Sequence, residues 1–249
     1  MAAAPLPLLG IFHEISIAVS DVRAAVEFYE RLGFTQATTT DAFAHPYGVL
    51  TDGRLFIGLH QRPGPSPILT FVRPGIAASL AAFAAAGIEL TSCHVGDEVF
   101  NEIAFTDPAG HTIAVLEART YSPVARVLTD ASLCGDFAEV SLPAGDFAAA
   151  REFWEPLGFV AADEVPAPYP HLPLISDHLD LAFHQPGFSA RPLLVFRDAA
   201  IRSRIERLRE LGLAVGSAPV QAAGNAAGAV SSRLESPDGT TLLLLEEDS

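Results

Sequence analysis

The chain has 249 residues, enough for one large domain or two of ordinary size, and 49 % of them are hydrophobic against 18 % charged. This balance is typical of a globular protein with a substantial core. The formal net charge of −15 repels phosphate backbones and anionic membrane surfaces, so neither nucleic acid nor membrane is an expected partner. The two cysteines need no disulfide framework, and the N-terminus lacks a basic segment. Both features predict a cytoplasmic protein.

The first predicted elements are a strand and an amphipathic helix in residues 13–34, HEISIAVSDVRAAVEFYERLGF. Residues 138–159, AEVSLPAGDFAAAREFWEPLGF, read almost the same way. In both stretches an aspartate follows the strand and a glycine follows the helix, as helix caps do. Each strand also contains a glutamate seven residues before the aspartate. These glutamates are Glu14 and Glu139.

The similarity between the two halves continues along the chain. Three later stretches of the first half have counterparts in the second. LFIGLHQ at 55–61 corresponds to LDLAFHQ at 179–185, and DPAGHTIAVLE at 107–117 corresponds to SPDGTTLLLLE at 236–246. A predicted helix that ends in glycine, at 81–90, corresponds to one at 205–215. A repeat of this kind indicates one structural unit written twice. We therefore predict two domains, residues 11–118 and 135–247, joined by a linker at 119–134.

Each copy contains a second, weaker period. In the first copy, a strand, a helix and about three short strands occupy residues 11–60, and the same order returns over residues 67–117. The chain is thus four βαβββ modules, which predicts an α+β fold with mixed sheets.

The motifs FYERLGF and DPAGH, in this order of elements, resemble the vicinal oxygen chelate superfamily, which includes glyoxalase I, bleomycin-resistance proteins and extradiol dioxygenases. The resemblance covers nearly the whole chain. It implies two tandem glyoxalase/bleomycin-resistance-type domains with open, curved mixed β-sheets, whose concave faces line a ligand cavity. It says little about the activity, because one scaffold carries many chemistries.

Strand alternation sorts the polar side chains onto the face away from the helices. Each copy places a glutamate and a histidine there, and a Glu–His pair in a dry cavity is a candidate for catalysis. The candidate catalytic residues are Glu14, His60, Glu139 and His184. Nearby polar residues, and tyrosines in two proline-rich loops expected at the cavity mouth, are candidate ligand contacts. These are Ser16, Tyr47, Thr70, Ser141 and Tyr169.

The resemblance also implies four metal-ligand positions in the metal-dependent members. They fall on or near Glu14, Gly58, Ile68 and Ala114 in the first copy and Glu139, Ala182, Leu193 and Leu243 in the second. Two of the four positions are aliphatic in each copy, and a stable site needs three or four protein ligands. We therefore predict no metal ligands and no cofactor.

These observations predict a protein that binds a small organic molecule, either as a sequestration protein or as an enzyme that needs no metal. If it is an enzyme, the resemblance implies a lyase, isomerase or dioxygenase. The alternative is a metal-dependent, glyoxalase-like lyase or a dioxygenase using Glu14/His60 or Glu139/His184 with a divalent metal. A third possibility is a regulatory module with a vestigial cavity. Tandem domains pair within one chain, so the sequence allows a monomer or a homodimer.

Overall fold

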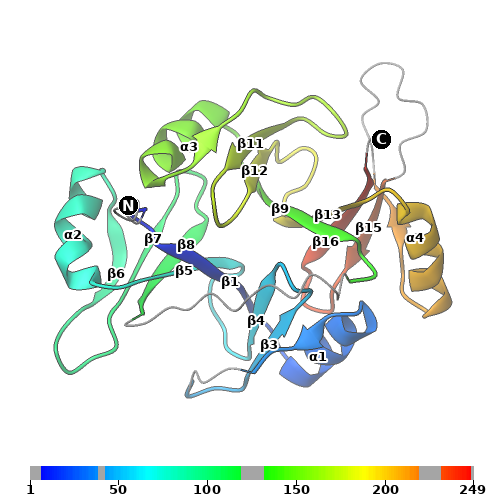
Figure 1. Cartoon of the computed structure of the whole chain (residues 1–249), viewed down its shortest axis with the longest axis horizontal. Helices are drawn as coiled ribbons and strands as arrows, with labels where there is room; N and C mark the ends of the chain where they lie inside the picture. Colours follow the sequence, from blue (N-terminus) through cyan, green and yellow to red (C-terminus); the bar gives the residue numbers. More distant parts are fainter. Residues whose placement is uncertain (1–6, 39–42, 119–131, 219–230, 248–249) are drawn as a thin grey trace, which may run out of the picture.

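A computed structural model describes residues 7–38, 43–118, 132–218 and 231–247. Within these residues the chain forms two eight-stranded mixed sheets, one from each repeat (Figure 1). The predicted α+β architecture of tandem βαβββ modules is confirmed. Most of the predicted linker, residues 119–131, lies outside the described residues, so the domain boundaries stay a prediction.

The first sheet has the strand order β2-β3-β4-β1-β5-β8-β7-β6. Its strands are β1 (Ile11–Ala18), β2 (Thr35–Gln36), β3 (Tyr47–Thr51), β4 (Phe56–His60), β5 (Ile68–Arg73), β6 (Leu90–His94), β7 (Glu102–Thr106) and β8 (Thr112–Glu117). The helices α1 (Val22–Arg31) and α2 (Ile76–Ala85) follow the first strand of each module. Tyr47, which was predicted in a proline-rich loop, is in fact the first residue of β3.

The second sheet repeats this order as β10-β11-β12-β9-β13-β16-β15-β14. Its strands are β9 (Asp136–Pro143), β10 (Val160–Ala161), β11 (His171–Ile175), β12 (Leu181–His184), β13 (Leu193–Asp198), β14 (Gly216–Ser217), β15 (Ser231–Glu235) and β16 (Thr241–Glu246). The helices are α3 (Phe147–Trp154), which continues as a 3-10 turn (Glu155–Leu157), and α4 (Ile201–Glu210).

The repeated aspartates begin the first helix of each domain. The Asp21 carboxylate accepts the backbone N–H groups of Arg23 and Ala24 at 2.9 and 3.1 Å, and Asp146 accepts that of Ala149 at 3.0 Å. Such caps satisfy N–H groups that have no partner inside the helix. The repeated Asp thus marks the same local structure in both domains and fixes where the preceding strand ends.

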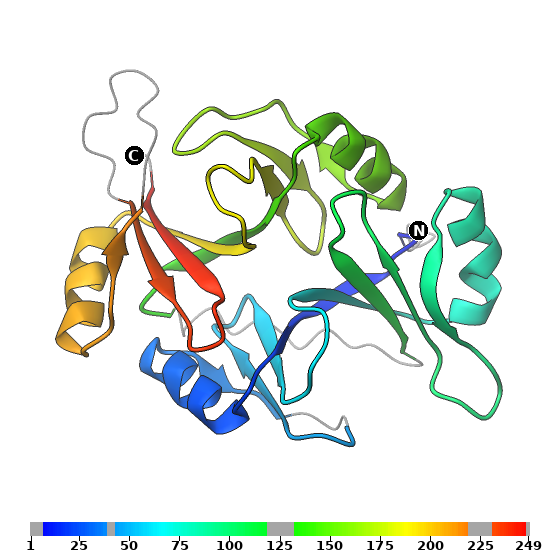
Figure 2. The same cartoon turned by 180° about the vertical axis from the view of Figure 1, so that it is seen from behind.

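One continuous hydrophobic core joins the two domains. Tyr29 of α1 and the equivalent Trp154 of α3 are fully buried in it. The Trp154 indole N–H donates to Asp107 of the other domain at 3.4 Å, and the Arg31 guanidinium donates to the Leu211 carbonyl at 2.6 Å. As Figures 1 and 2 show, α1 therefore lies near α4, while α3 lies beside the second half of the first sheet.

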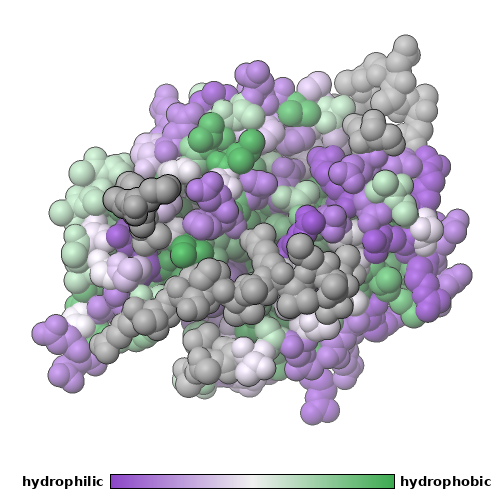
Figure 3. Space-filling view, viewed as in Figure 1, coloured by the Kyte–Doolittle hydropathy of each residue, from purple (hydrophilic) through white to green (hydrophobic). Residues whose placement is uncertain are grey.

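Hydrophilic side chains cover much of the face in Figure 3, most densely over α4 and its neighbouring strands, and hydrophobic residues form separate smaller areas. This agrees with the high formal charge of the chain. No helix in the described part of the chain is long and apolar enough to cross a membrane.

Candidate functional site

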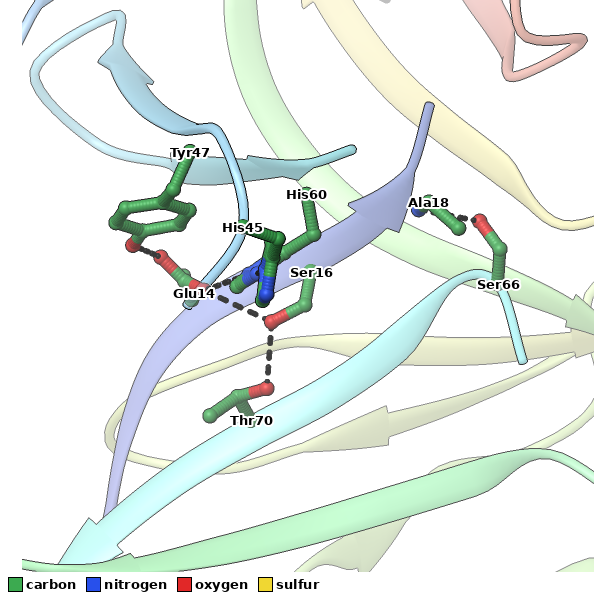
Figure 4. A network of polar contacts seen from close by, with 8 residues as sticks. All are labelled: Glu14, Ser16, Ala18, His45, Tyr47, His60, Ser66 and Thr70. Atoms are coloured by element: carbon green, nitrogen blue, oxygen red, sulfur yellow. Dashed lines mark hydrogen bonds and ion pairs between the residues drawn. The ribbon is translucent and has the colours of Figure 1, made fainter. Parts of the chain in front are cut away.

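The carboxylate of Glu14, at the centre of β1, is buried and lies at the centre of a polar network (Figure 4). It accepts hydrogen bonds from the Ser16 hydroxyl at 2.8 Å, from the Tyr47 hydroxyl at 2.8 Å and from His60 Nε2 at 3.2 Å. Three strands supply these groups, because β1 lies beside β4, and β4 beside β3. The structure thus brings four of the predicted site residues of the first domain into direct contact.

A second set of hydrogen bonds orients these donors. Because the Ser16 hydroxyl gives its one proton to Glu14, the Thr70 hydroxyl, 2.8 Å away on β5, donates to Ser16. On the other side, His45 Nε2 lies 3.0 Å from His60 Nδ1. Partial burial, with the nearby His60 and Arg62, lowers the pKa of His45. Neutral His45 therefore donates to His60, which in turn donates to Glu14.

His45 and its neighbour Phe43 were not among the predicted site residues. The Phe43 ring lies against His60 with centroids 5.0 Å apart and against Tyr47 at 4.6 Å. The available signal was the sequence DAFAHPYGVL at residues 41–50, which concentrates aromatic residues just before β3. Strand alternation did not reach this segment, so it could not identify His45.

The position of the Glu14 carboxylate depends on Gly58 of β4, which stands opposite Ser16 in the parallel pair of strands. A Cβ built on Gly58 would overlap the carboxylate of Glu14. Glycine is thus required here for close approach and not for a special backbone conformation. In the sequence, Gly58 stood out only because it occupies a metal-ligand position without a ligating side chain. In the structure, its lack of a side chain leaves room for the Glu14 carboxylate.

The network determines the charge of Glu14. Burial alone would raise the pKa of its carboxyl, but the His60 hydrogen bond, the nearby His13 and the hydrogen bonds from Ser16 and Tyr47 together hold that pKa below its ordinary value. Glu14 is therefore ionised at neutral pH. A buried carboxylate in this state is stable because all of its neighbours donate to it.

A cavity of about 150 Å³ adjoins this network. Its polar lining comes from Ser16, His60 and Arg62, and its apolar walls include Ala18 and Ile68. The loop at residues 62–65 forms another part of the lining. The Ser66 hydroxyl anchors this loop by accepting the backbone N–H of Ala18 at 3.1 Å (Figure 4).

The second domain arranges the equivalent residues differently. Glu139 accepts a hydrogen bond from the Tyr169 hydroxyl at 3.0 Å, while His184 Nδ1 lies 2.8 Å from the Ser141 hydroxyl and His184 Nε2 donates to the Ser189 carbonyl at 3.1 Å. Glu139 and His184 thus have separate partners, and the expected pairing of glutamate and histidine occurs in the first domain and not in the second. Tyr169, expected at a cavity mouth, is fully buried.

Two substitutions between the repeats account for this difference. Ala182 stands opposite Ser141, where Gly58 stands opposite Ser16, and its methyl group occupies the space that the Glu14 carboxylate uses in the first domain. The loop after β12 also carries Phe188, whose ring stacks on Tyr169 at 4.5 Å with an interplanar angle of 4°. Phe188 packs there with a small apolar cluster of residues, namely Tyr169, Leu193, Val195, Leu243 and Leu245.

The side chains do not fit a metal ion at either concave face. In the described residues no three His, Cys, Asp or Glu side chains gather within metal-binding reach. In the sheet Glu14 stands opposite Thr70, whereas Ile68, the position expected from the sequence, stands opposite Ser16. Thr70 pairs with Ala114, so Gly58, Thr70 and Ala114 offer one hydroxyl and no imidazole or carboxylate. His60 directs its Nε2 atom at Glu14 itself.

Comparison with protein families gives one match. Residues 11–115 match the family described as the Glyoxalase/Bleomycin resistance protein/Dioxygenase superfamily. No curated protein matches the chain.

Solved structures with the same fold cover both domains. A catechol 2,3-dioxygenase is 16 % identical, with a TM-score of 0.64 over 95 % of this chain and 87 % of that one. The 2,3-dioxygenase LapB from Pseudomonas sp. KL28 is 14 % identical, with a TM-score of 0.66 over 99 % and 94 %. The Mn(II)-bound glyoxalase from Novosphingobium aromaticivorans is 15 % identical, with a TM-score of 0.61 over 95 % and 82 %. At these identities the likeness shows the fold alone.

Proposed function

Because residues 11–115 match the glyoxalase/bleomycin resistance protein/dioxygenase superfamily and the second half of the chain repeats the same fold, we propose that the first domain binds a small organic molecule without a metal ion. One observation carries this proposal. The concave face of the first domain keeps a cavity beside Ser16 and His60, whereas Phe188 packs onto the equivalent face of the second domain.

The cavity selects a ligand by size and charge. About 150 Å³ is on the scale of a cavity that holds one benzene ring. The ionised Glu14 lies one hydrogen bond behind Ser16 and His60, and the Arg62 guanidinium also lines the cavity. The two opposite charges balance, which favours a neutral ligand over a charged one. The Ser16 oxygen keeps one lone pair after bonding Glu14 and Thr70, so it can accept a hydrogen bond from a ligand hydroxyl or amine.

The same geometry favours binding over acid–base catalysis by Glu14. A general base works best when its pKa lies near the working pH. The pKa of Glu14 is held below its ordinary value, and three donors already occupy its oxygens. The role that these contacts support for Glu14 is to hold Ser16 and His60 in place at the cavity wall.

The test is calorimetric titration of chelator-treated protein with phenol, aniline, benzylamine and benzoate. We expect at least one of the neutral rings, phenol or aniline, to bind in the small cavity more tightly than benzylamine, and any benzoate binding to be independent of Ile68. Ile68→Trp would fill the cavity from one wall and weaken the binding of the neutral ring about tenfold or more. If no ring compound binds, or if Ile68→Trp leaves the affinity unchanged while the protein stays folded, the proposal is wrong.

A further inference from the structure

A larger cavity, of about 940 Å³, lies between the two domains. The first domain contributes the end of β1 and the loop at residues 61–67, and the second contributes the start of β13 and the turn at residues 235–240. Figure 2 shows this turn, between β15 and β16, beside the first module of the first domain. We propose that this cavity is a second binding site, for a small organic monocarboxylate.

The cavity is open because the two turns at the domain interface, one from each domain, make different contacts. The turn DPAGH at residues 107–111 is equivalent to the turn SPDGT at residues 236–240. In the first of these, His111 Nε2 reaches across to the Pro143 carbonyl at 2.9 Å and bridges the domains. Its equivalent, Thr240, is much shorter, and it faces the cavity together with Ala18, the equivalent of Pro143. A pocket at a domain interface, near the upper end of the usual size range, is a common position for a ligand site.

Two arginines line the cavity and differ in their partners. The Arg191 guanidinium donates to Glu235 at 2.8 Å and to the Gly239 carbonyl at 3.2 Å, so its charge is already balanced. Arg62 lines both this cavity and the smaller one. It is exposed, and among the residues that the structure describes its guanidinium has no hydrogen bond or ion pair. A guanidinium presents paired N–H donors that match the two oxygens of a carboxylate. Arg62 is therefore the anchor for one anionic group.

The other walls define the rest of the ligand. The side chains of Val19, Pro67, Pro192 and Leu194 give the cavity an apolar floor, suited to a hydrocarbon or aromatic body. Asp238, which accepts the Ser20 backbone N–H at 3.3 Å, and Glu235 also line it. These two carboxylates repel a second negative charge, which favours a monocarboxylate over a phosphate dianion.

The experiment is calorimetric titration with phenylacetate, and with phenylacetamide, phenyl phosphate and phenethylamine as matched probes. We expect phenylacetate to bind at least about tenfold more tightly than the amide, because a hydrogen-bonded charge is lost. Arg62→Gln should weaken phenylacetate binding by a similar factor. Thr240→His, which places the bridging side chain of the other interface into the cavity, should do the same. Ile68→Trp, which fills the smaller cavity, should leave phenylacetate binding unchanged.

Three results would overturn the proposal. They are equal binding of amide and carboxylate, unchanged affinity in Arg62→Gln, and loss of phenylacetate binding in Ile68→Trp, which would place the carboxylate in the first-domain cavity. Thermal melts of each variant show whether it folds. If Thr240→His does not, Arg62→Gln decides the question, because Arg62 is exposed and its replacement leaves the core intact.

Discussion

The carboxylate of Glu14 occupies the space in which a side chain at Gly58 would begin. In the second repeat the residue equivalent to Gly58 is Ala182, and Glu139 accepts a hydrogen bond from Tyr169 while His184 contacts Ser141. The methyl group of Ala182, absent at Gly58, thus distinguishes the arrangement of Glu139 and His184 from that of Glu14 and His60.

Gly58→Ala should therefore push Glu14 away from His60. A buried carboxylate that loses a charged or polar partner costs about 1–3 kcal/mol, so we expect the free energy of unfolding to fall by that amount in urea titrations. The reverse change, Ala182→Gly, is the matched control and should cost about 1 kcal/mol or less. A Gly58→Ala protein as stable as the wild type would contradict the described fit of Glu14.

Glu14→Gln should destabilise the protein more than Glu139→Gln. Glu14 accepts three side-chain hydrogen bonds, and a neutral amide can accept at only one oxygen. Glu139 accepts one side-chain hydrogen bond in the described structure, from the Tyr169 hydroxyl. We expect a loss of about 2 kcal/mol for Glu14→Gln, with the smaller effect at residue 139. Chemical denaturation of both variants measures this difference, and equal losses would contradict it.

Phe188→Ala should open the concave face of the second domain. Its ring stacks flat on Tyr169, and such a pair contributes about 0.5–1.5 kcal/mol beyond the burial of area. We expect lower stability and new binding of a small neutral ring such as benzene, detected by titration or by chemical shifts near Tyr169. Ser189→Ala, which alters the same loop but keeps the ring, is the control and should gain no binding.

Acid should destabilise the protein partly through His184. Burial lowers the pKa of His184 from an ordinary 6.5 to about 4. The hydrogen bond to the Ser189 carbonyl raises this pKa, but its effect is smaller than that of burial. Below pH 6.5 the unfolded chain binds a proton at this residue that the folded chain excludes until about pH 4. The stability from the neutral side chain is therefore present above pH 6.5 and is lost as the pH falls toward 4.

The size of this loss is about 3 kcal/mol, from 1.36 kcal/mol for each unit of pKa. Urea denaturation of the wild type and His184→Gln at several pH values between 7 and 4 measures it. We expect the curve of the variant to be flatter than that of the wild type over this range. If the free energy of unfolding falls equally with pH in the wild type and in His184→Gln, His184 is not the cause of the acid sensitivity.

Much of the first-domain site could be predicted from the sequence, because strand alternation is a local rule. It placed Glu14, Ser16, Thr70 and His60 on one face, and β-sheet pairing then brought them into contact. The repetition of Glu14 as Glu139 identified the acid without any structure. The fold followed for the same reason, since capping and turn residues recur at equivalent places in both halves.

What the sequence could not predict depends on space filled by distant residues. The loop at residues 185–192 differs in length and composition from the loop at 61–67, and only the packing shows that Phe188 turns inward onto Tyr169. The contrast of Thr240 with His111 is visible in the sequence, but its consequence, an open domain interface, depends on how the two domains meet.

The site around Glu14 is proposed to bind its ligand without a metal ion. Elemental analysis of protein purified without chelators, combined with ring-compound titrations before and after chelator treatment, tests it most directly. We expect less than stoichiometric metal and unchanged affinity for the bound ring compound after chelation. Stoichiometric manganese, iron, nickel or zinc that disappears in Glu14→Gln, together with loss of binding after chelation, would contradict it.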